Sequence, residues 1–280
     1  MRFATIRTGD ENRAARVDGE ELVLLGFDDV GQLIASGDGW AERAAEAEGE
    51  RVALADADFA PLTPAPEKIF FVGLNYHDHA VESDMALPEV PVIFPKYARS
   101  LIGAKDDIVI PEPLSEQVDW EIELGVVIGT PARFVDEDEA EAAIAGYTLV
   151  NDVTARDWQL RTSQWMPGKI VEGFTPVGPF LVTPDEVDHA RALGMRLTLD
   201  GEVMQDSSTS QLVFTPKQIV AYLSQLITLA PGDLISTGTP AGVGHLRDPR
   251  VYLTPGKVVE STMEGLGTQT NHCVAGGAGR

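Results

Sequence analysis

The chain has 280 residues, of which 44% are hydrophobic, and its 44 acidic residues against 21 Lys and Arg give a formal net charge of −23. Nucleic acids and anionic membrane surfaces require a basic footprint, so this charge disfavours both as partners. No run approaches the 18 apolar residues of a membrane span. The single cysteine, Cys273, cannot form a disulfide within the chain, which favours a reducing compartment. We therefore expect a cytoplasmic globular protein.

The first sixty residues have the pattern of a small separate unit. MRFATIRT (1–8) and EELVLLGF (20–27) are typical of short strands, and residues 28–47 have a helical pattern that is interrupted at Gly37 to Gly39. Three prolines in FAPLTPAPEK (59–68) then favour an extended linker. We predict a small N-terminal α/β domain over residues 1–62 and a second domain over residues 63–280.

The rest of the chain is dominated by short strand patterns that are separated by Gly, Pro and Asp turns. Helical patterns occur at 136–144, which begins with acids, and at 216–226, which begins with Pro216. Strands outnumber helices and do not alternate with them regularly, so we expect a β-rich α+β fold, a barrel or roll with peripheral helices. The strand patterns are KIFFVGL (68–74), DDIVIP (106–111), EIELGVVIG (121–129), YTLVNDV (147–153), MRLTLDGEVM (195–204), DLISTG (233–238) and KVVESTME (257–264).

Three carboxylates, Asp119, Glu121 and Glu123, occupy every second position of the apolar run 119–129. Strict alternation is the period of a β-strand, so these side chains are expected on one face. Two residues of strand rise by roughly 6.6 Å, so Glu121 and Glu123 can converge on one point. Buried carboxylates need a partner, and Mg²⁺, Mn²⁺ and Ca²⁺ prefer oxygen ligands. The alternative is a half-exposed strand with an acidic, solvated face.

Asp152 directly follows the apolar strand 147–150, where its side chain can supply a third oxygen ligand. The alternative is that Asp152 accepts backbone N–H bonds at a turn or helix start. Arg156 and Gln159 come next, at helical spacing. Arg156 either pairs with an acid structurally or binds a substrate carboxylate through two hydrogen bonds.

Two histidines lie in GLNYHDHAVE (73–82), after a predicted strand. A helix that begins near His77 places His79 and Glu82 three residues apart, on one face. In such a pair the carboxylate orients the imidazole, which can take a proton from water. The alternative is a solvated turn with incidental histidines.

Two further segments contain candidate binding groups. Lys169 lies in QWMPGKIVEGFTPVGP (164–179), which we expect to be a loop, and the alternative for Lys169 is an ordinary surface lysine. DLISTGTPAGVG (233–244) is rich in glycine but lacks the lysine of a phosphate-binding P-loop. Its backbone N–H groups, together with Thr239, can still hold a carboxylate.

The order of these segments resembles the fumarylacetoacetate hydrolase family. The resemblance covers roughly residues 66–274, and the small N-terminal unit fits the variable leading domain of that family. In combination, three segments are highly specific: E-x-E-L-G from Glu121, D-x-T-A-R-D-x-Q from Asp152, and T-G-T-P-x-G-V-G over 237–244. The resemblance implies a mixed β-roll with the site at its open end, and a homodimer.

The resemblance also implies roles for individual residues. It places an Mg²⁺ or Mn²⁺ ion on Glu121, Glu123 and Asp152, and leaves Asp119 outside the ligand set. Its water-activating pair falls on His79 and Glu82, on a short lid helix. The positions that contact substrate or oxyanion are Lys96, Arg156, Gln159, Lys169 and Thr239, with Lys169 as the oxyanion group and Lys96 as a basic residue beside the lid.

The activity that the resemblance implies is hydrolysis of a C–C bond in an acylpyruvate-like 2,4-dioxo acid, through a metal-bound enolate and an activated water. Decarboxylation of oxaloacetate and keto–enol isomerisation of a hydroxymuconate-type acid use the same enolate, so the residues do not choose among them. A protein that is stabilised by metal but does not catalyse a reaction is the third alternative.

Overall fold

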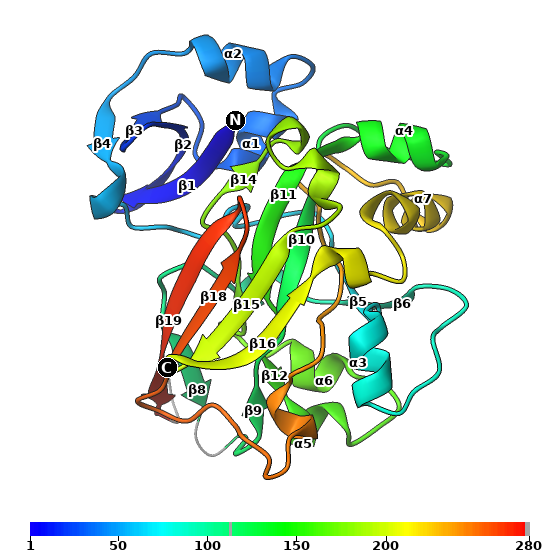
Figure 1. Ribbon diagram of the computed structural model, residues 1–280. Coiled ribbons are helices and arrows are strands. Elements are labelled where there is room, and N and C mark those ends of the chain that lie inside the picture. The colour runs from blue at the N-terminus through cyan, green and yellow to red at the C-terminus, as the bar shows by residue number, and fades with distance from the viewer. Residues whose placement is uncertain (112–113, 278–280) are drawn as a thin grey trace.

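The computed structural model describes residues 1–111 and 114–277, and its framework is two β-sheets packed face to face (Figure 1). The larger sheet contains, in spatial order, β4 (Arg51–Ala53), β3 (Glu21–Leu24), β2 (Glu11–Asp18), β1 (Arg2–Thr8), β14 (Leu181–Val182), β11 (Ile144–Asn151), β10 (Ile122–Ile128), β17 (Leu234–Ser236), β5 (Ile69–Gly73) and β6 (Val92–Pro95). The second sheet contains β16 (Glu202–Ser208), β15 (Gly194–Leu199), β18 (Val258–Met263), β19 (Gly267–Gly276) and β8 (Ile108–Pro111). Most neighbouring strands are antiparallel, but β17 with β5 and β19 with β8 are parallel, so the sheets are mixed.

Short elements surround the two sheets. Two further strand pairs form, β9 (Val118–Asp119) with β12 (Thr154–Ala155) and β7 (Leu101–Ile102) with β13 (Thr175–Pro176). The α-helices are α1 (Val30–Ala35), α2 (Trp40–Glu46), α3 (His77–Glu82), α4 (Glu137–Ala142), α5 (Arg156–Gln159), α6 (Met166–Lys169) and α7 (Pro216–Leu226). The 3₁₀ helices are η1 (Leu54–Asp56), η2 (Ala98–Ser100), η3 (Pro184–Glu186), η4 (Asp188–Ala190), η5 (Thr209–Gln211) and η6 (Gly244–Leu246). Within the described ranges, no helix is long and apolar enough to cross a membrane. The expected β-rich α+β fold with peripheral helices is confirmed.

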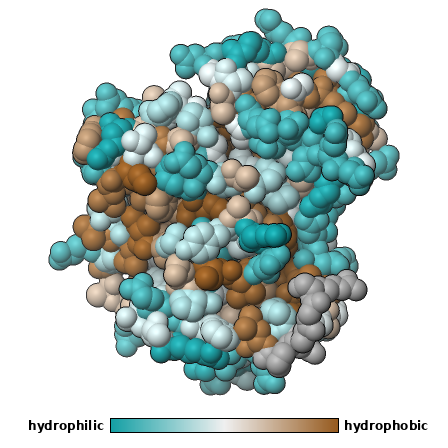
Figure 2. All heavy atoms as spheres, turned by 180° about the vertical axis from the view of Figure 1, so that it is seen from behind, coloured by the Kyte–Doolittle hydropathy of each residue, from teal (hydrophilic) through white to brown (hydrophobic). Residues whose placement is uncertain are grey.

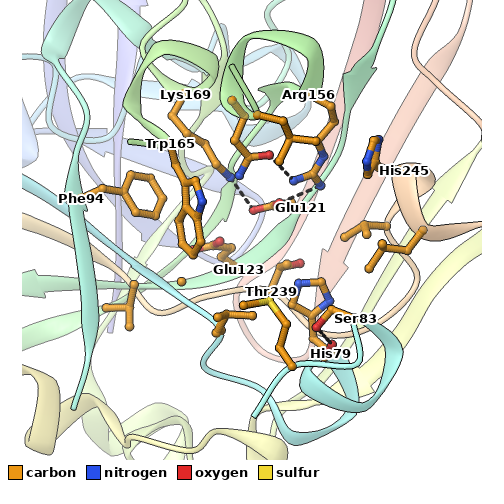
Figure 3. Close-up of a pocket in the computed structure, with 18 residues that line it drawn as sticks. His79, Ser83, Phe94, Glu121, Glu123, Arg156, Trp165, Lys169, Thr239 and His245 are labelled. Atoms are coloured by element: carbon orange, nitrogen blue, oxygen red, sulfur yellow. Dashed lines mark hydrogen bonds and ion pairs between the residues drawn. The ribbon is translucent and has the colours of Figure 1, made fainter. Parts of the chain in front are cut away.

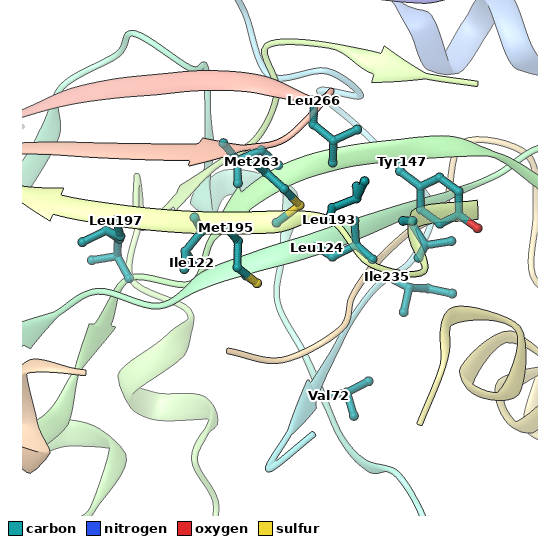
Figure 4. Close-up of a cluster of buried hydrophobic side chains, with 14 of the residues drawn as sticks. Val72, Ile122, Leu124, Tyr147, Leu193, Met195, Leu197, Ile235, Met263 and Leu266 are labelled. Atoms are coloured by element: carbon teal, nitrogen blue, oxygen red, sulfur yellow. The ribbon is translucent and has the colours of Figure 1, made fainter. Parts of the chain in front are cut away.

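The main hydrophobic core lies between the two sheets (Figure 4). Alternate residues of β10, including Ile122 and Leu124, face Met195 and Leu197 of β15 across this core, and Met263 of β18 joins them. These side chains are less than 5% exposed. The core therefore holds one face of β10, while Glu123 belongs to the opposite face, which is where the carboxylates gather.

The first sixty residues extend the larger sheet, because β1 pairs antiparallel with β14. The predicted strands at 1–8 and 20–27 correspond to β1 and β3, and the interrupted helix at 28–47 corresponds to α1 and α2. Strand β2 was missed, because half of ENRAARVD (11–18) is charged and only Ala14 and Ala15 are buried. The domain boundary at residues 62 and 63 stays a prediction.

The expectation of one continuous strand over 119–129 is wrong at its start. Trp120 and Glu121 separate β9 from β10. Side chains replace the missing ladder bonds there: the Glu121 N–H donates to Asn151 Oδ1 (3.0 Å) and the Ile122 N–H donates to the Gln205 Oε1 atom (3.0 Å). The break matters for the site, because Asp119 then pairs with Thr154 in a different sheet from Glu123.

A cavity-creating substitution tests this core assignment. We expect Leu124→Ala to lower the free energy of unfolding by about 2–5 kcal/mol, since the packed sheets cannot close around the cavity. Val203→Ala, at a position on β16 that is 46% exposed, is the control and should change it by less than about 1 kcal/mol. Urea unfolding measures both variants. Equal losses in the two variants would contradict the assignment.

Candidate functional site

Three carboxylates meet at one end of β10 and β11. Oxygen atoms of Glu121, Glu123 and Asp152 all lie within 4.8 Å of one another, and the three residues are at most 6% exposed. The antiparallel register that pairs Ile122 with Asn151 brings the start of β10 beside the end of β11. The Asp152 N–H donates to the Glu121 carbonyl (2.8 Å), which fixes the two segments against each other. The structure thus brings together the three residues that were predicted as metal ligands.

Two buried lysines neutralise part of this negative charge. Lys169 Nζ donates to Glu121 Oε2 (2.8 Å) and to Asp152 Oδ2 (2.7 Å), and Lys96 Nζ donates to Asp152 Oδ1 (2.8 Å) and to the Phe174 carbonyl (2.9 Å). Lys169 lies in the short helix α6 and not in the expected loop. Burial lowers the pKa of Lys96 despite the adjacent Asp152 charge. Burial also lowers the pKa of Lys169, but the charges of Asp152 and Glu121 outweigh it and raise the pKa overall.

Arg156 joins the acidic cluster to the loop that follows β17. Its Nε donates to Asp119 Oδ2 (2.8 Å), and one terminal nitrogen lies 2.7 Å from Glu121 Oε1. Asp119 is fully buried and also accepts the N–H groups of Gly244 (2.7 Å) and His245 (2.9 Å). The sequence placed Asp119 in a flanking role, outside the ligand set. Its position in the alternating run 119–129 was the one local sign that its side chain is buried near Glu121.

Glu123 has no basic partner among the described residues. Its Oε2 accepts the Ser236 hydroxyl and the Gly238 N–H (2.9 Å). Burial, followed by the charges of Asp152 and Glu121, raises the pKa of Glu123 well above its usual value. With every group ionised, the four connected acids Asp119, Glu121, Glu123 and Asp152 exceed the three bases Lys96, Arg156 and Lys169 by one charge, which is why the raised pKa falls on Glu123, the acid with no basic partner. Three buried carboxylates with one negative charge that no base compensates fit a hard divalent cation such as Mg²⁺ or Mn²⁺.

The histidine pair forms as its spacing predicts. In α3, His79 Nδ1 lies 3.0 Å from Glu82 Oε2. The other oxygen of Glu82 accepts the N–H of Gly242 (2.8 Å), and Asp78 accepts the Ser207 hydroxyl (2.6 Å). These contacts hold α3 against the loop after β17 and against β16. With Nδ1 protonated toward Glu82, the Nε2 atom of His79 is the basic nitrogen.

These groups line one cavity of about 390 Å³ (Figure 3). Among the predicted site residues, those that line the cavity are His79, Glu121, Glu123, Arg156, Gln159, Lys169 and Thr239. Lys96 and Asp152 do not line the cavity, because their side chains are fully buried beneath the residues that do. The role of Lys96 in substrate binding stays a prediction. Several other lining residues have no local signal in the sequence. They include Ser83 at the end of α3, Phe94 in the edge strand β6, Trp165 just before α6, and His245 in η6.

Comparisons with known proteins identify a family for most of the chain. A family model described as fumarylacetoacetate (FAA) hydrolase C-terminal matches residues 68–274. The mitochondrial oxaloacetate tautomerase FAHD2A of Homo sapiens is 44% identical over 217 residues, covering 77% of this chain and 68% of the relative. The 2,4-didehydro-3-deoxy-L-rhamnonate hydrolase of a Sphingomonas strain is 50% identical over 204 residues, covering 72% and 71%.

Solved structures match over nearly the whole chain. The fumarylacetoacetate hydrolase of Exiguobacterium antarcticum has a TM-score of 0.87 at 32% identity, covering 99% of this chain and 100% of that one. The maleylpyruvate hydrolase of Sphingobium sp. SYK-6, in complex with manganese(II) ion and pyruvate, has a TM-score of 0.81 at 27% identity, with coverage of 99% and 100%.

Thermal unfolding tests the candidate metal site. Mg²⁺ or Mn²⁺ at about 100 times its dissociation constant should stabilise the wild-type fold by about 2.7 kcal/mol, because the ion binds only the folded chain. Glu123→Gln should abolish this rise in melting temperature. Glu202→Gln removes an equal charge from an exposed position of β16 and should retain the rise. A rise that survives in Glu123→Gln would place the ion elsewhere.

Proposed function

The chain belongs to the fumarylacetoacetate hydrolase family, and we propose that it is a divalent-metal-dependent hydrolase that cleaves a C–C bond of acylpyruvate-like 2,4-dioxo acids. One observation carries the proposal: His79, oriented by Glu82, lines the same cavity as Glu121 and Glu123. A protein that used a metal only for stability would have no need of a water-activating pair beside it. The 50%-identical relative, a hydrolase named for a 2,4-didehydro acid, supports this choice of reaction.

Different residues of the cavity have different roles in the proposed hydrolysis. Glu121, Glu123 and Asp152 would hold Mg²⁺ or Mn²⁺, which supplies Lewis-acid stabilisation of negative charge on the oxo oxygens of the substrate. Lys169 uses two of its three N–H donors on carboxylates, so the third is available for an oxyanion. Gln159 and Thr239 line the same wall and offer uncharged donors to the substrate.

His79 is the residue that accepts the proton of the attacking water, and Glu82 orients it. His79 Nε2 takes a proton from water as the oxygen of that water bonds to the distal carbonyl carbon, C4. The C3–C4 bond then breaks, and its electron pair remains on the pyruvate fragment as the enolate. The proton that His79 took from water is returned to C3, which gives pyruvate, and the acyl fragment leaves as a carboxylic acid. Glu82 keeps the imidazole in one orientation throughout, because its second oxygen is fixed by Gly242.

Keto–enol conversion of oxaloacetate is the second candidate. The 44%-identical human relative, named as an oxaloacetate tautomerase, favours it. That conversion, like decarboxylation of the same acid, moves protons or carbon dioxide without an attacking water. The two candidates therefore differ in how strongly they depend on His79.

Substitution of His79 distinguishes them. With acetylpyruvate and Mg²⁺ or Mn²⁺, we expect His79→Ala to lower kcat for release of pyruvate and acetate by about 10²–10⁴-fold, the usual contribution of a general base. His77→Ala, at an exposed position of the same helix, is the matched control and should retain activity. NMR of the products measures both variants. Full hydrolysis by His79→Ala, or no turnover of 2,4-dioxo acids by the wild type, would refute the proposed hydrolysis.

A cytoplasmic homodimer is part of the proposal. In the described chain, β4 and β6 end the larger sheet and β16 and β8 end the smaller one, and such edges commonly pair across a two-fold axis. Light scattering after gel filtration should give twice the 30.1 kDa of one chain. A mass of one chain at micromolar concentration would contradict the dimer.

A further inference from the structure

We infer that the substrate carries a single carboxylate, at the metal end, and that its far end is an uncharged, hydroxylated tail that His245 recognises. This inference rests on the proposed function, because it assumes that the oxo-acid head binds at Glu121, Glu123 and Asp152.

The positive charges of the cavity lie at the head end and are already paired. Among the described residues, the Arg and Lys side chains that line the cavity are two, Arg156 and Lys169. Arg156 contacts Asp119 and Glu121, and Lys169 contacts Glu121 and Asp152, at 2.7–2.8 Å. Both cations are therefore already compensated by carboxylates of the protein, and a second substrate carboxylate would have to enter the cavity of a chain of net charge −23, which opposes its binding.

One wall of the cavity is aromatic and apolar. Phe94 and Trp165 pack edge to face, with ring centroids 6.1 Å apart, and lie on one side of the carboxylates in Figure 3. Trp165 reaches this position because residue 73 is glycine: a Cβ there would lie 2.3 Å from Cζ3 of the indole. This wall suits the C–H surface of a carbon chain and offers nothing to a second carboxylate.

The remaining polar groups of the cavity are uncharged and keep unused hydrogen-bonding capacity. Thr239 Oγ1 accepts Gln205 Nε2 (2.8 Å), and within the described residues its own O–H is not donated. Gln159 Oε1 accepts Arg156 (3.0 Å), while its amide NH₂ makes no hydrogen bond to the described chain. Ser83 lines the same space, and because its O–H donates to the His79 carbonyl (2.8 Å), it offers an acceptor only. Neutral donors and acceptors of this kind match hydroxyl groups and reject analogues that lack them.

His245 lies across the cavity from the aromatic wall (Figure 3). Its Nδ1 lies 2.9 Å from the Tyr252 hydroxyl, which orients the ring, and its Nε2 forms no hydrogen bond with the residues that the structure describes. Burial, followed by the charge of Arg156, lowers the pKa of His245, so the ring is neutral near pH 7. A neutral imidazole nitrogen can bind a hydroxyl but provides no charge for a carboxylate.

Asp119 fixes the spacing between the head and tail sites. One carboxylate holds Arg156 beside Glu121 and also accepts the backbone N–H groups of Gly244 and His245. The position of His245 relative to the acidic cluster is therefore set by hydrogen bonds and not by a free loop.

Two acids of equal length test the inference without any chemical step. 6-Hydroxy-2-oxohexanoate and 2-oxohexanedioate differ only in a terminal CH₂OH or carboxylate, and neither has the 4-oxo group that cleavage requires. Titration calorimetry with the Mn²⁺-loaded protein should give at least about tenfold tighter binding of the hydroxy acid. Equal or tighter binding of the diacid would overturn the inference. Hydrolysis of acetylpyruvate is measured separately. Its absence would refute the proposed function, whereas the ratio of the two dissociation constants tests the preference for a hydroxylated tail.

Substitutions of His245 test its role in the same assay. His245→Arg supplies a cation, so we expect the preference for the hydroxy acid to fall by about tenfold or to reverse. His272→Arg, at an exposed position of β19, adds the same charge elsewhere and should leave the ratio unchanged. His245→Phe, which keeps a flat ring, should weaken the hydroxy acid alone. If the folded His245 variants bind both acids in the wild-type ratio, His245 does not select the tail.

Discussion

The rest of this structure depends on a buried cluster of charges that is one positive charge short. Four acids and three bases are removed from water at the ends of β10 and β11, and each base is held by at least one carboxylate at about hydrogen-bond distance. Burying charges in this way is unfavourable unless partners compensate them. Glu123, which has only a hydroxyl and an N–H as donors, is the member whose charge is left uncompensated. A bound divalent cation would provide that compensation, since Mg²⁺ and Mn²⁺ prefer oxygen ligands of this kind.

The fold explains why the proposed catalytic groups lie around this cluster. The hydrophobic core takes one face of β10, so the opposite face is free to hold Glu123, and the strand break at Trp120 and Glu121 redirects Asp119 toward the loop after β17. That loop also binds Glu82 of the short helix α3 through Gly242. Backbone N–H groups of this loop thus bind Glu82, Glu123 and Asp119, so a shift of the loop would disturb the His79 and Glu82 pair and the acidic cluster together.

Part of this arrangement could be predicted from local sequence signals. Strand alternation indicated Glu121 and Glu123, and the position directly after a buried strand indicated Asp152. The spacing of three residues indicated the His79 and Glu82 pair, and Pro216 marked the first turn of α7. These signals are local because each depends on the period of a single element.

Other features had no such signal. Lys96 lies 56 residues from Asp152, and nothing around it shows that its amine is buried on that carboxylate. The contact between Gly73 and Trp165 likewise joins distant segments. Strand β2 was hidden because its buried residues are two alanines in a charged stretch. The break between β9 and β10 depends on the side chains of Asn151 and Gln205, which only the tertiary fold brings to that point.

Anomalous X-ray diffraction from crystals grown with Mn²⁺ tests the central claim most directly. The account predicts one strong manganese peak, bonded to oxygen atoms of Glu121, Glu123 and Asp152 at roughly 2.0–2.2 Å, with the Lys169 amine outside the coordination shell. A structure at saturating Mn²⁺ with no peak at these three carboxylates, and with the Lys169 amine still bridging Glu121 and Asp152, would contradict it.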